Sequence, residues 1–219
     1  MSDSVEQLYQ LRFSSAELEK KKKLWKILCH NFFQKYIPPD ATVVDIGAGY
    51  CEFINNIEAK LKFAVDLNPA ISQYALPEVK CFNSRAEKLD FLQDGCADVV
   101  FMSNFLEHLE NKSAVLAVLS ESFRIIKPGG SLLVLQPNIK YLYKQYWDFF
   151  DHKVPLSDIS LREALELAGF KIQLLFPRFL PYTTKGKLPW NDLLVTIYLK
   201  TRIAWKILGA QTFVIGIKP

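Results

Sequence analysis

The stretch Val43-Val44-Asp45-Ile46-Gly47-Ala48-Gly49 decides the fold of this chain. Its apolar, β-branched residues are typical of a buried strand, and the two glycines predict a tight turn where that strand ends. Open α/β sheets bind their ligands at the carboxyl ends of their strands. The stretch therefore predicts a parallel sheet with a ligand site at this edge.

Short apolar segments alternate with helical patterns on both sides of this stretch. Strands are expected at 41–46, 61–65, 79–82, 97–102, 131–136, 170–176 and 212–217, and helices at 15–37, 111–126 and 191–208, with helical spacing also at 53–57. A further helix is expected to begin with a capping box of Ser160 and Glu163 and to end at Gly169. The pattern predicts a seven-stranded, mostly parallel, doubly wound α/β sheet.

The same pattern predicts the domain organisation. Residues 1–40 read as an N-terminal helical extension and 41–219 as the main domain. Within that domain, 137–156 is an aromatic segment expected to form a lid, and 177–210 is expected to be a basic, helical insertion before the last strand.

Composition excludes several classes of protein. Half of the 219 residues are hydrophobic and 13% are aromatic, which excludes a disordered chain. No apolar stretch is long enough to span a membrane, and the N-terminus lacks the pattern of a signal peptide. The four cysteines are widely spaced, which predicts free thiols, a cytoplasmic location and no metal site.

The positive charge is concentrated near the C-terminus. The net charge is +4, and residues 177–219 hold seven basic residues and one acidic residue. This face is either an ordinary solvated surface or one that attracts an anionic partner, such as a phosphate-bearing substrate or a membrane surface.

Acidic residues around the glycine turn indicate the kind of ligand. A dinucleotide site would have a third glycine at position 52, but this chain has Glu52 there, and Asp45 precedes the turn. Two carboxylates would repel a pyrophosphate and would suit a cationic ligand. Asp66, about 20 residues further on, can accept hydrogen bonds from a ribose. S-adenosylmethionine combines a ribose with positive charge and has no diphosphate.

At this point the sequence resembles the class I S-adenosylmethionine-dependent methyltransferases. The resemblance covers 41–136 and rests on motifs in the family's order, namely Asp45-Ile46-Gly47-Ala48-Gly49, Asp66, Ser84-Arg85-Ala86-Glu87, Asp98-Val99-Val100-Phe101, Ser103-Asn104-Phe105-Leu106-Glu107-His108-Leu109 and Lys127-Pro128-Gly129-Gly130. Cys51 departs from the family's pattern, which often has a third glycine there.

The resemblance implies roles for eight cofactor-binding residues. Asp45, Gly47 and Gly49 would line the methionine part, and Asn104 would lie near the methyl group. The others would hold the nucleoside, with Asp66 on the ribose and Leu67, Arg85 and Ala86 around the adenine. Structural roles remain open for three of them, because Asp45 and Asn104 could be caps and Asp66 a turn residue.

A narrower resemblance concerns the acceptor. Residues 146–152 (YWDFFDH) and 178–183 (RFLPYT) are similar to segments of small methyltransferases associated with bacterial surface-polysaccharide synthesis. This resemblance implies O-methylation of a glycan or a glycan intermediate. A small-metabolite methyltransferase and a catalytically inactive nucleotide-binding protein of the same fold are the alternatives. A nucleic-acid substrate is not expected, because the basic residues lie away from the cofactor motifs, and the oligomeric state is left open.

Three residues are candidates for catalysis. Transfer to a hydroxyl benefits from a base, and His108 follows the fourth strand on the expected cofactor side. Asp151 and His152 lie in the expected lid and could form a tuned acid–base pair. His108 could instead only orient Glu107, and the aromatic run before Asp151 could be packing rather than a platform for sugar rings.

Overall fold

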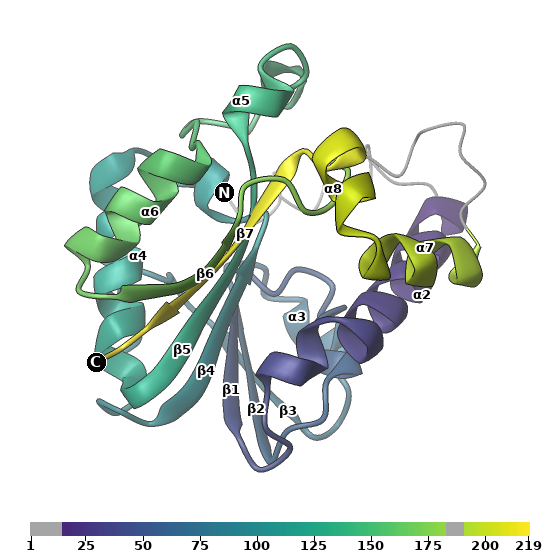
Figure 1. Ribbon diagram of the computed structural model, residues 1–219. Coiled ribbons are helices and arrows are strands. Elements are labelled where there is room, and N and C mark those ends of the chain that lie inside the picture. Colours follow the sequence, from purple (N-terminus) through teal and green to yellow (C-terminus); the bar gives the residue numbers. More distant parts are fainter. Residues whose placement is uncertain (1–14, 183–190) are drawn as a thin grey trace.

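The computed structural model describes residues 15–182 and 191–219. Seven strands form a single sheet in the order β3-β2-β1-β4-β5-β7-β6 (Figure 1). The strands are β1 (Thr42–Ile46), β2 (Leu61–Asp66), β3 (Val79–Asn83), β4 (Ala97–Ser103), β5 (Ile126–Pro137), β6 (Lys171–Phe176) and β7 (Gln211–Ile217). This confirms the predicted seven-stranded α/β fold.

Strands β1 to β5 run parallel, and β7 runs antiparallel to both β5 and β6. The direction of travel across the sheet reverses at β1, because β2 lies on one side of it and β4 on the other. Such a reversal is where doubly wound sheets bind ligands. The turn after Ile46 therefore lies at the position that the fold favours for a site.

Helices cover both faces of the sheet (Figure 1). One face carries α2 (Ser15–Asn31), α3 (Ile71–Tyr74), α7 (Asp192–Lys200) and α8 (Arg202–Leu208), and the other carries α4 (Lys112–Ile125) and α6 (Asp158–Leu167). The short helix α5 (Ile139–Leu142) projects beyond the end of the sheet in Figure 1. The two faces bury separate hydrophobic clusters, as expected for a sheet covered on both sides.

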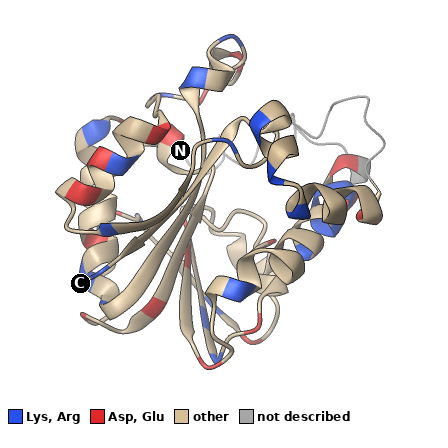
Figure 2. Cartoon of the chain, in the orientation of Figure 1, with Lys and Arg blue, Asp and Glu red and all other residues tan. Residues whose placement is uncertain are grey.

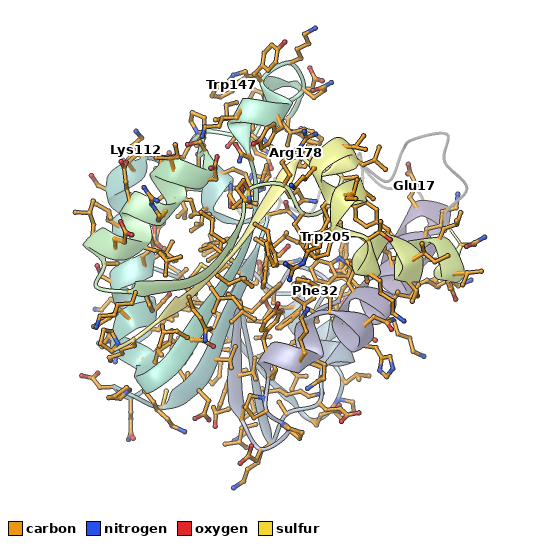
Figure 3. The ribbon with its side chains drawn as sticks, viewed as in Figure 1. Glu17, Phe32, Lys112, Trp147, Arg178 and Trp205 are labelled. Atoms are coloured by element: carbon orange, nitrogen blue, oxygen red, sulfur yellow. The ribbon has the colours of Figure 1, made fainter. Side chains whose placement is uncertain are left out.

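Aromatic rings join the N-terminal helix to the C-terminal segment. Phe32, just after α2, stacks on Phe179 with ring centroids 4.2 Å apart. Trp205 of α8, labelled with Phe32 in Figure 3, lies edge-on to Phe32 at 6.0 Å. All three rings are buried. The described part of 1–40 thus shares one core with the described part of 177–210. The domain boundaries remain predictions, and residues 1–14 and 183–190 lie outside the described residues.

Two helical predictions differ from the structure at their ends. The helix expected at 15–37 stops at Asn31 and is followed by a 3-10 turn, Phe33–Tyr36. The cap of α6 is Ser157, whose hydroxyl accepts from the backbone of Ser160 while the Ser160 hydroxyl accepts from that of Ser157. The predicted capping box of Ser160 and Glu163 is therefore wrong by one turn, since Ser157 supplies an equivalent hydroxyl earlier.

Two further helices are shorter than the sequence predicted. The spacing at 53–57 gives only a 3-10 turn, Ile54–Asn56, because Asn55 bonds through its side chain to the backbone of Tyr74 and Leu76. The helix expected at 191–208 breaks at Thr201 into α7 and α8. The Trp205 indole there donates to the carbonyl of Tyr198, 2.8 Å away, while its ring enters the core.

Candidate active site

The turn after β1 has the left-handed backbone that its glycines allow. Gly47 has φ +70° and Gly49 has φ +53°, and the next left-handed residue is Cys51 at +58°. The Phe105 ring packs so closely on Gly47 that a Cβ there would overlap it. Both the backbone angle and the space thus require glycine at 47. Cys51, where the family often has a third glycine, has the left-handed backbone although it carries a side chain.

Asp66 at the end of β2 holds this turn in place. Its Oδ2 accepts a hydrogen bond of 2.8 Å from the backbone N–H of Gly49, and its Oδ1 accepts one of 2.8 Å from Asn68. Each carboxylate oxygen has a second lone pair for another donor. The neighbouring Leu67 is 52% exposed, so its side chain is available to a planar ligand.

Asp45 is a buried carboxylate close to the turn. Its side chain is 2% exposed, and Oδ2 has no hydrogen-bond partner among the described residues. Burial raises the pKa of Asp45 well above its usual value, and the charges of Glu52 and Asp66 raise it further. Glu52 is itself paired with Lys21 of α2 at 3.1 Å. A cationic ligand beside Asp45 would favour the ionised carboxylate.

Asn104 lies directly after β4, the strand next to β1. It has φ +48°, and its backbone N–H donates to the carbonyl of Leu135 at 2.9 Å. Its Nδ2 donates to the hydroxyl of Ser103 at 3.1 Å, while its Oδ1 is buried with no partner in the described part of the chain. The ends of β1 and β4 thus each present a buried oxygen acceptor that the described residues do not satisfy.

The two cofactor-binding candidates in the loop after β3 have different environments. Arg85 is exposed and forms an ion pair of 2.8 Å with Glu87. Ala86 is 6% exposed and belongs to the hydrophobic cluster on the α4 face. Of these two residues, only Arg85 has an exposed side chain, which could turn toward a ligand if its ion pair with Glu87 opened.

A second polar cluster follows β4 and includes the three catalytic candidates. His108 lies on the 3-10 turn Leu106–His108, and its Nδ1 is 3.2 Å from both the carbonyl oxygen and Oδ2 of Asp151. The rings of His108 and His152 are 5.1 Å apart between centroids. His152 is buried, and its Nε2 lies 3.2 Å from the hydroxyl of Tyr182. The sequence predicted a pair of Asp151 and His152, and in the structure Asp151 contacts His108, from the segment after β4.

Glu107 and Gln136 extend this cluster and were not predicted as site residues. Glu107 is fully buried, and neither of its carboxylate oxygens has a hydrogen-bond partner among the described residues. Gln136, at the end of β5, is 1% exposed, and its amide is likewise without a partner there. The signal in the sequence that could have found them is the placement of polar residues at or just after the ends of apolar strands. Buried polar groups without partners are rare, so both side chains are candidates for contact with a ligand.

Burial and nearby charges shift the pKa values of two groups in the cluster. Burial raises the pKa of Glu107, although the nearby His108 and Gln136 oppose the shift. Burial lowers the pKa of His108, but Glu107 and Asp151 more than offset this, so the net shift is upward. The imidazole of His108 thus accepts a proton more readily than a free histidine.

The aromatic segment 141–150 is partly core and partly exposed. Tyr146 is fully buried and donates to the carbonyl of Val154 at 2.6 Å. Trp147 is 57% and Phe150 92% exposed, and Figure 3 shows Trp147 on the segment that projects beyond the sheet. Tyr146 thus packs in the core, whereas Trp147 and Phe150 face solvent, and the platform for sugar rings stays a prediction.

Comparisons with known proteins agree with the fold and the turn. The family model of the methyltransferase domain matches residues 44–134, and no curated protein matches the chain. A SAM-dependent methyltransferase from Archaeoglobus fulgidus is 21% identical, with TM-score 0.67, 90% of this chain and 94% of that chain covered. A geranyl diphosphate C-methyltransferase from Streptomyces coelicolor is 15% identical, with TM-score 0.62 and coverages of 93% and 83%.

Residues 44–134 therefore match a methyltransferase domain, in a fold shared with an S-adenosylmethionine-dependent methyltransferase. The structure of the geranyl diphosphate C-methyltransferase contains S-adenosyl-L-homocysteine, and the methyltransferase-domain match of this chain supports the predicted cofactor, S-adenosylmethionine. The reaction is thus methyl transfer in general, and the acceptor is a separate question.

Proposed function

We propose that this protein transfers a methyl group from S-adenosylmethionine to a hydroxyl of a glycan or glycan intermediate. The observation that carries the methyl-transfer part of the proposal is a row of buried polar atoms, without partners in the described residues, along the ends of β1, β4 and β5. These are Asp45 Oδ2, Asn104 Oδ1, both carboxylate oxygens of Glu107 and the amide of Gln136. Such groups are costly to bury unless a ligand satisfies them.

The first half of this row fits the amino-acid part of the cofactor. Asp45 and Asn104 offer oxygen acceptors for an ammonium group, and only acceptors are needed there. The left-handed turn at Gly47 and Gly49 would let the backbone approach the same ligand closely. When bound, S-adenosylmethionine supplies a methyl group already activated by its sulfonium.

The nucleoside would lie on the β2 and β3 side of the turn. Asp66 would accept from the ribose hydroxyls through its remaining lone pairs while it still holds Gly49. Leu67 would cover one face of the adenine, and Arg85 and Ala86 would lie along its edge.

The second half of the row is the proposed acceptor side. Glu107, His108, Asp151 and His152 would surround the attacking hydroxyl and help remove its proton. The hydroxyl oxygen would form a bond to the methyl carbon as the carbon–sulfur bond breaks, and that electron pair would remain on sulfur. Most of the acceleration would come from holding these atoms in line.

Exposed aromatic rings next to this cluster support a sugar acceptor. Trp147 and Phe150 lie in the segment that supplies Asp151 and His152, and both rings face solvent. Pyranose rings have apolar faces that pack on aromatic side chains. Large apolar rings exposed beside a polar site, such as these two, would offer a surface for that packing.

A small-metabolite acceptor is the second candidate. It is supported by the structural likeness to the geranyl diphosphate C-methyltransferase, whose acceptor is a small phosphorylated molecule. The row of polar atoms fits either acceptor, so the two candidates differ in what contacts the exposed aromatic segment.

The face formed by α7 and α8 supports a lipid-linked or anionic acceptor. Apolar side chains of α7 and α8 are exposed, among them Leu193, Ile203 and Ile207. The exposed basic residues Lys200, Arg202 and Lys206 belong to the same two helices, which carry blue segments in Figure 2. Interfacial helices combine these two kinds of residue. The described residues contain no helix able to cross a membrane. We propose peripheral contact with an anionic surface, and the cytoplasmic location and the lack of nucleic-acid binding stay predictions.

Two measurements test the proposed function. Calorimetry with S-adenosylmethionine, S-adenosylhomocysteine and NAD should show binding of the first two only. A panel of glycans, glycan intermediates and small hydroxylated metabolites, incubated with methyl-labelled cofactor, should then show a mass shift for a glycan. Label on metabolites alone would replace the glycan by the second candidate, and cofactor binding without any label would support the inactive binding protein.

A further inference from the structure

Three potential metal ligands meet at the acceptor side of the site. Glu107, His108 and His152 each offer one ligand atom, and these atoms lie within 4.8 Å of one another. They come from two segments that are distant in sequence, the turn after β4 and the loop after the aromatic run. The sequence predicted no metal site because no metal-binding spacing links these residues along the chain.

Glu107 is the strongest sign that something is bound here. Its carboxylate is fully buried, and neither oxygen has a partner in hydrogen-bond geometry within the described residues, although the Gln136 amide lies nearby. Its basic neighbour is His108, whose Nε2 is 3.8 Å from Oε1 of Glu107, too long for a hydrogen bond. A buried carboxylate needs a partner, and a cation between these atoms would supply it.

The surroundings of both histidines are typical of metal ligands. Because Nδ1 of His108 lies 3.2 Å from Oδ2 of Asp151, a proton on Nδ1 would leave the Nε2 lone pair directed toward Glu107. His152 is oriented by its contact with the Tyr182 hydroxyl and by Phe149, whose ring stacks on it at 5.0 Å. Metal-bound histidines are commonly held by such second contacts.

We propose that Glu107, His108 and His152 bind a divalent cation of the zinc type. Two imidazoles and one carboxylate are a common ligand set for catalytic zinc, which keeps at least one position open. Imidazole ligands favour Zn²⁺ or Co²⁺ over Mg²⁺ and Ca²⁺. Bonds of about 2.1 Å bring ligand atoms to roughly 3.4 Å from one another, so binding would draw these side chains inward.

The open position would receive the acceptor hydroxyl. The cation would lower the pKa of that hydroxyl, the proton would pass to solvent, and the oxygen would attack the methyl carbon. This role of the cation rests on the proposed transfer to an oxygen, whereas cation binding itself does not. Cofactor binding at Asp45 and Asp66 does not depend on the cation.

Cobalt provides a direct test, because its visible absorption bands report the ligands and the coordination number. The full chain is freed of metal with a chelator and titrated with Co²⁺, and Zn²⁺ is then added as competitor. We expect one Co²⁺ per chain with intense bands that Zn²⁺ removes. Glu107→Gln and His152→Ala should each weaken Co²⁺ binding by more than about 100-fold, and Asp151→Asn by roughly 10- to 100-fold.

The controls separate a metal site from a structural role. His30→Ala replaces an exposed histidine of α2 and should leave the cobalt spectrum unchanged. Metal-free Glu107→Gln should melt at or above the temperature of the metal-free parent, because a buried charge is removed, yet lose cobalt. Absence of cobalt bands in the parent, or unchanged bands in both ligand variants, would overturn the proposal. Calorimetry with S-adenosylhomocysteine on the metal-free chain tests the cofactor site separately.

Discussion

Asp66 accepts a hydrogen bond of 2.8 Å from the backbone of Gly49, so the acidic residue of one strand end fixes the glycine turn of its neighbour. The two residues belong to the ends of β2 and β1, which pair in parallel register up to Ile46 and Val65. The same carboxylate therefore has two tasks, namely shaping the turn and offering lone pairs to a ligand.

Asp66→Ala should weaken binding of S-adenosylhomocysteine by about 1.5–3 kcal/mol, the scale of a hydrogen bond to a charged group. Loss of the Gly49 contact should add to this by loosening the turn. Isothermal titration measures the change. Asp40→Ala, which alters an exposed aspartate before β1, should bind like the parent. Equal affinity of the Asp66 and Asp40 variants would remove Asp66 from the site.

Gly47→Ala should destabilise the protein and abolish cofactor binding. The new Cβ would overlap the Phe105 ring in addition to the strain of a positive φ. Gly129→Ala is a matched control, because Gly129 has φ +80° and the described residues leave open space for at least 4 Å around the position of an added Cβ. We expect a loss of about 1–2 kcal/mol for Gly129→Ala from backbone strain alone and a larger loss for Gly47→Ala, both measured by urea unfolding.

Asp45→Asn should stabilise the cofactor-free protein and weaken cofactor binding. Because the pKa of Asp45 is raised in the fold, its contribution to stability is greatest below the unfolded pKa and is lost as pH rises through the folded pKa. Above that range the parent holds a buried, destabilising carboxylate that the amide variant lacks. Chemical unfolding at several pH values measures the difference, which should shrink in acid.

Cofactor binding should depend on pH in the opposite sense. A cation beside Asp45 favours the ionised form, so affinity should fall as pH is lowered through the pKa of this carboxyl. Binding at lower pH should release a proton, visible by calorimetry in buffers of different ionisation enthalpy. A proton release that persists in Asp45→Asn would assign it to another group.

Phe32→Ala should cost about 3–5 kcal/mol of stability, the usual range for a large aromatic removed from a core. Phe32 is 1% exposed and contacts rings from both the N-terminal and C-terminal segments. Phe150→Ala, at a ring that is 92% exposed, should leave stability unchanged. On the proposal that this ring contacts a sugar, Phe150→Ala should also raise KM for the glycan and leave the affinity for the cofactor unchanged.

Ile203→Ser with Ile207→Ser should reduce binding to vesicles that contain anionic lipid. Both side chains are about two-thirds or more exposed on α8, at 72% and 67%, so their loss should affect the surface and not the fold. Co-sedimentation with anionic and neutral vesicles measures this, with melting temperature as the check on folding. Equal sedimentation of parent and variant would leave α8 as an ordinary solvated surface.

The sequence by itself determined the sheet and the cofactor. Short apolar strands that alternate with helices are typical of such a sheet, and Gly47, Gly49 and Asp66 are local signals at strand ends. It did not determine helix ends such as the cap of α6, because Ser157 and Ser160 are both good caps and only packing chooses between them.

Tertiary structure alone decided which distant residues meet at the acceptor side. His108 bonds Asp151 and lies beside His152 because the loop after α5 folds back over the turn after β4, as shown by Lys153 and Val154 donating to the carbonyl of Glu107. Neither strand periodicity nor motif spacing encodes such a contact. The burial of the Glu107 carboxylate, with no hydrogen-bond partner across 15–182 and 191–219, is equally a property of the folded chain, since local sequence carries no record of which polar groups packing will isolate from water.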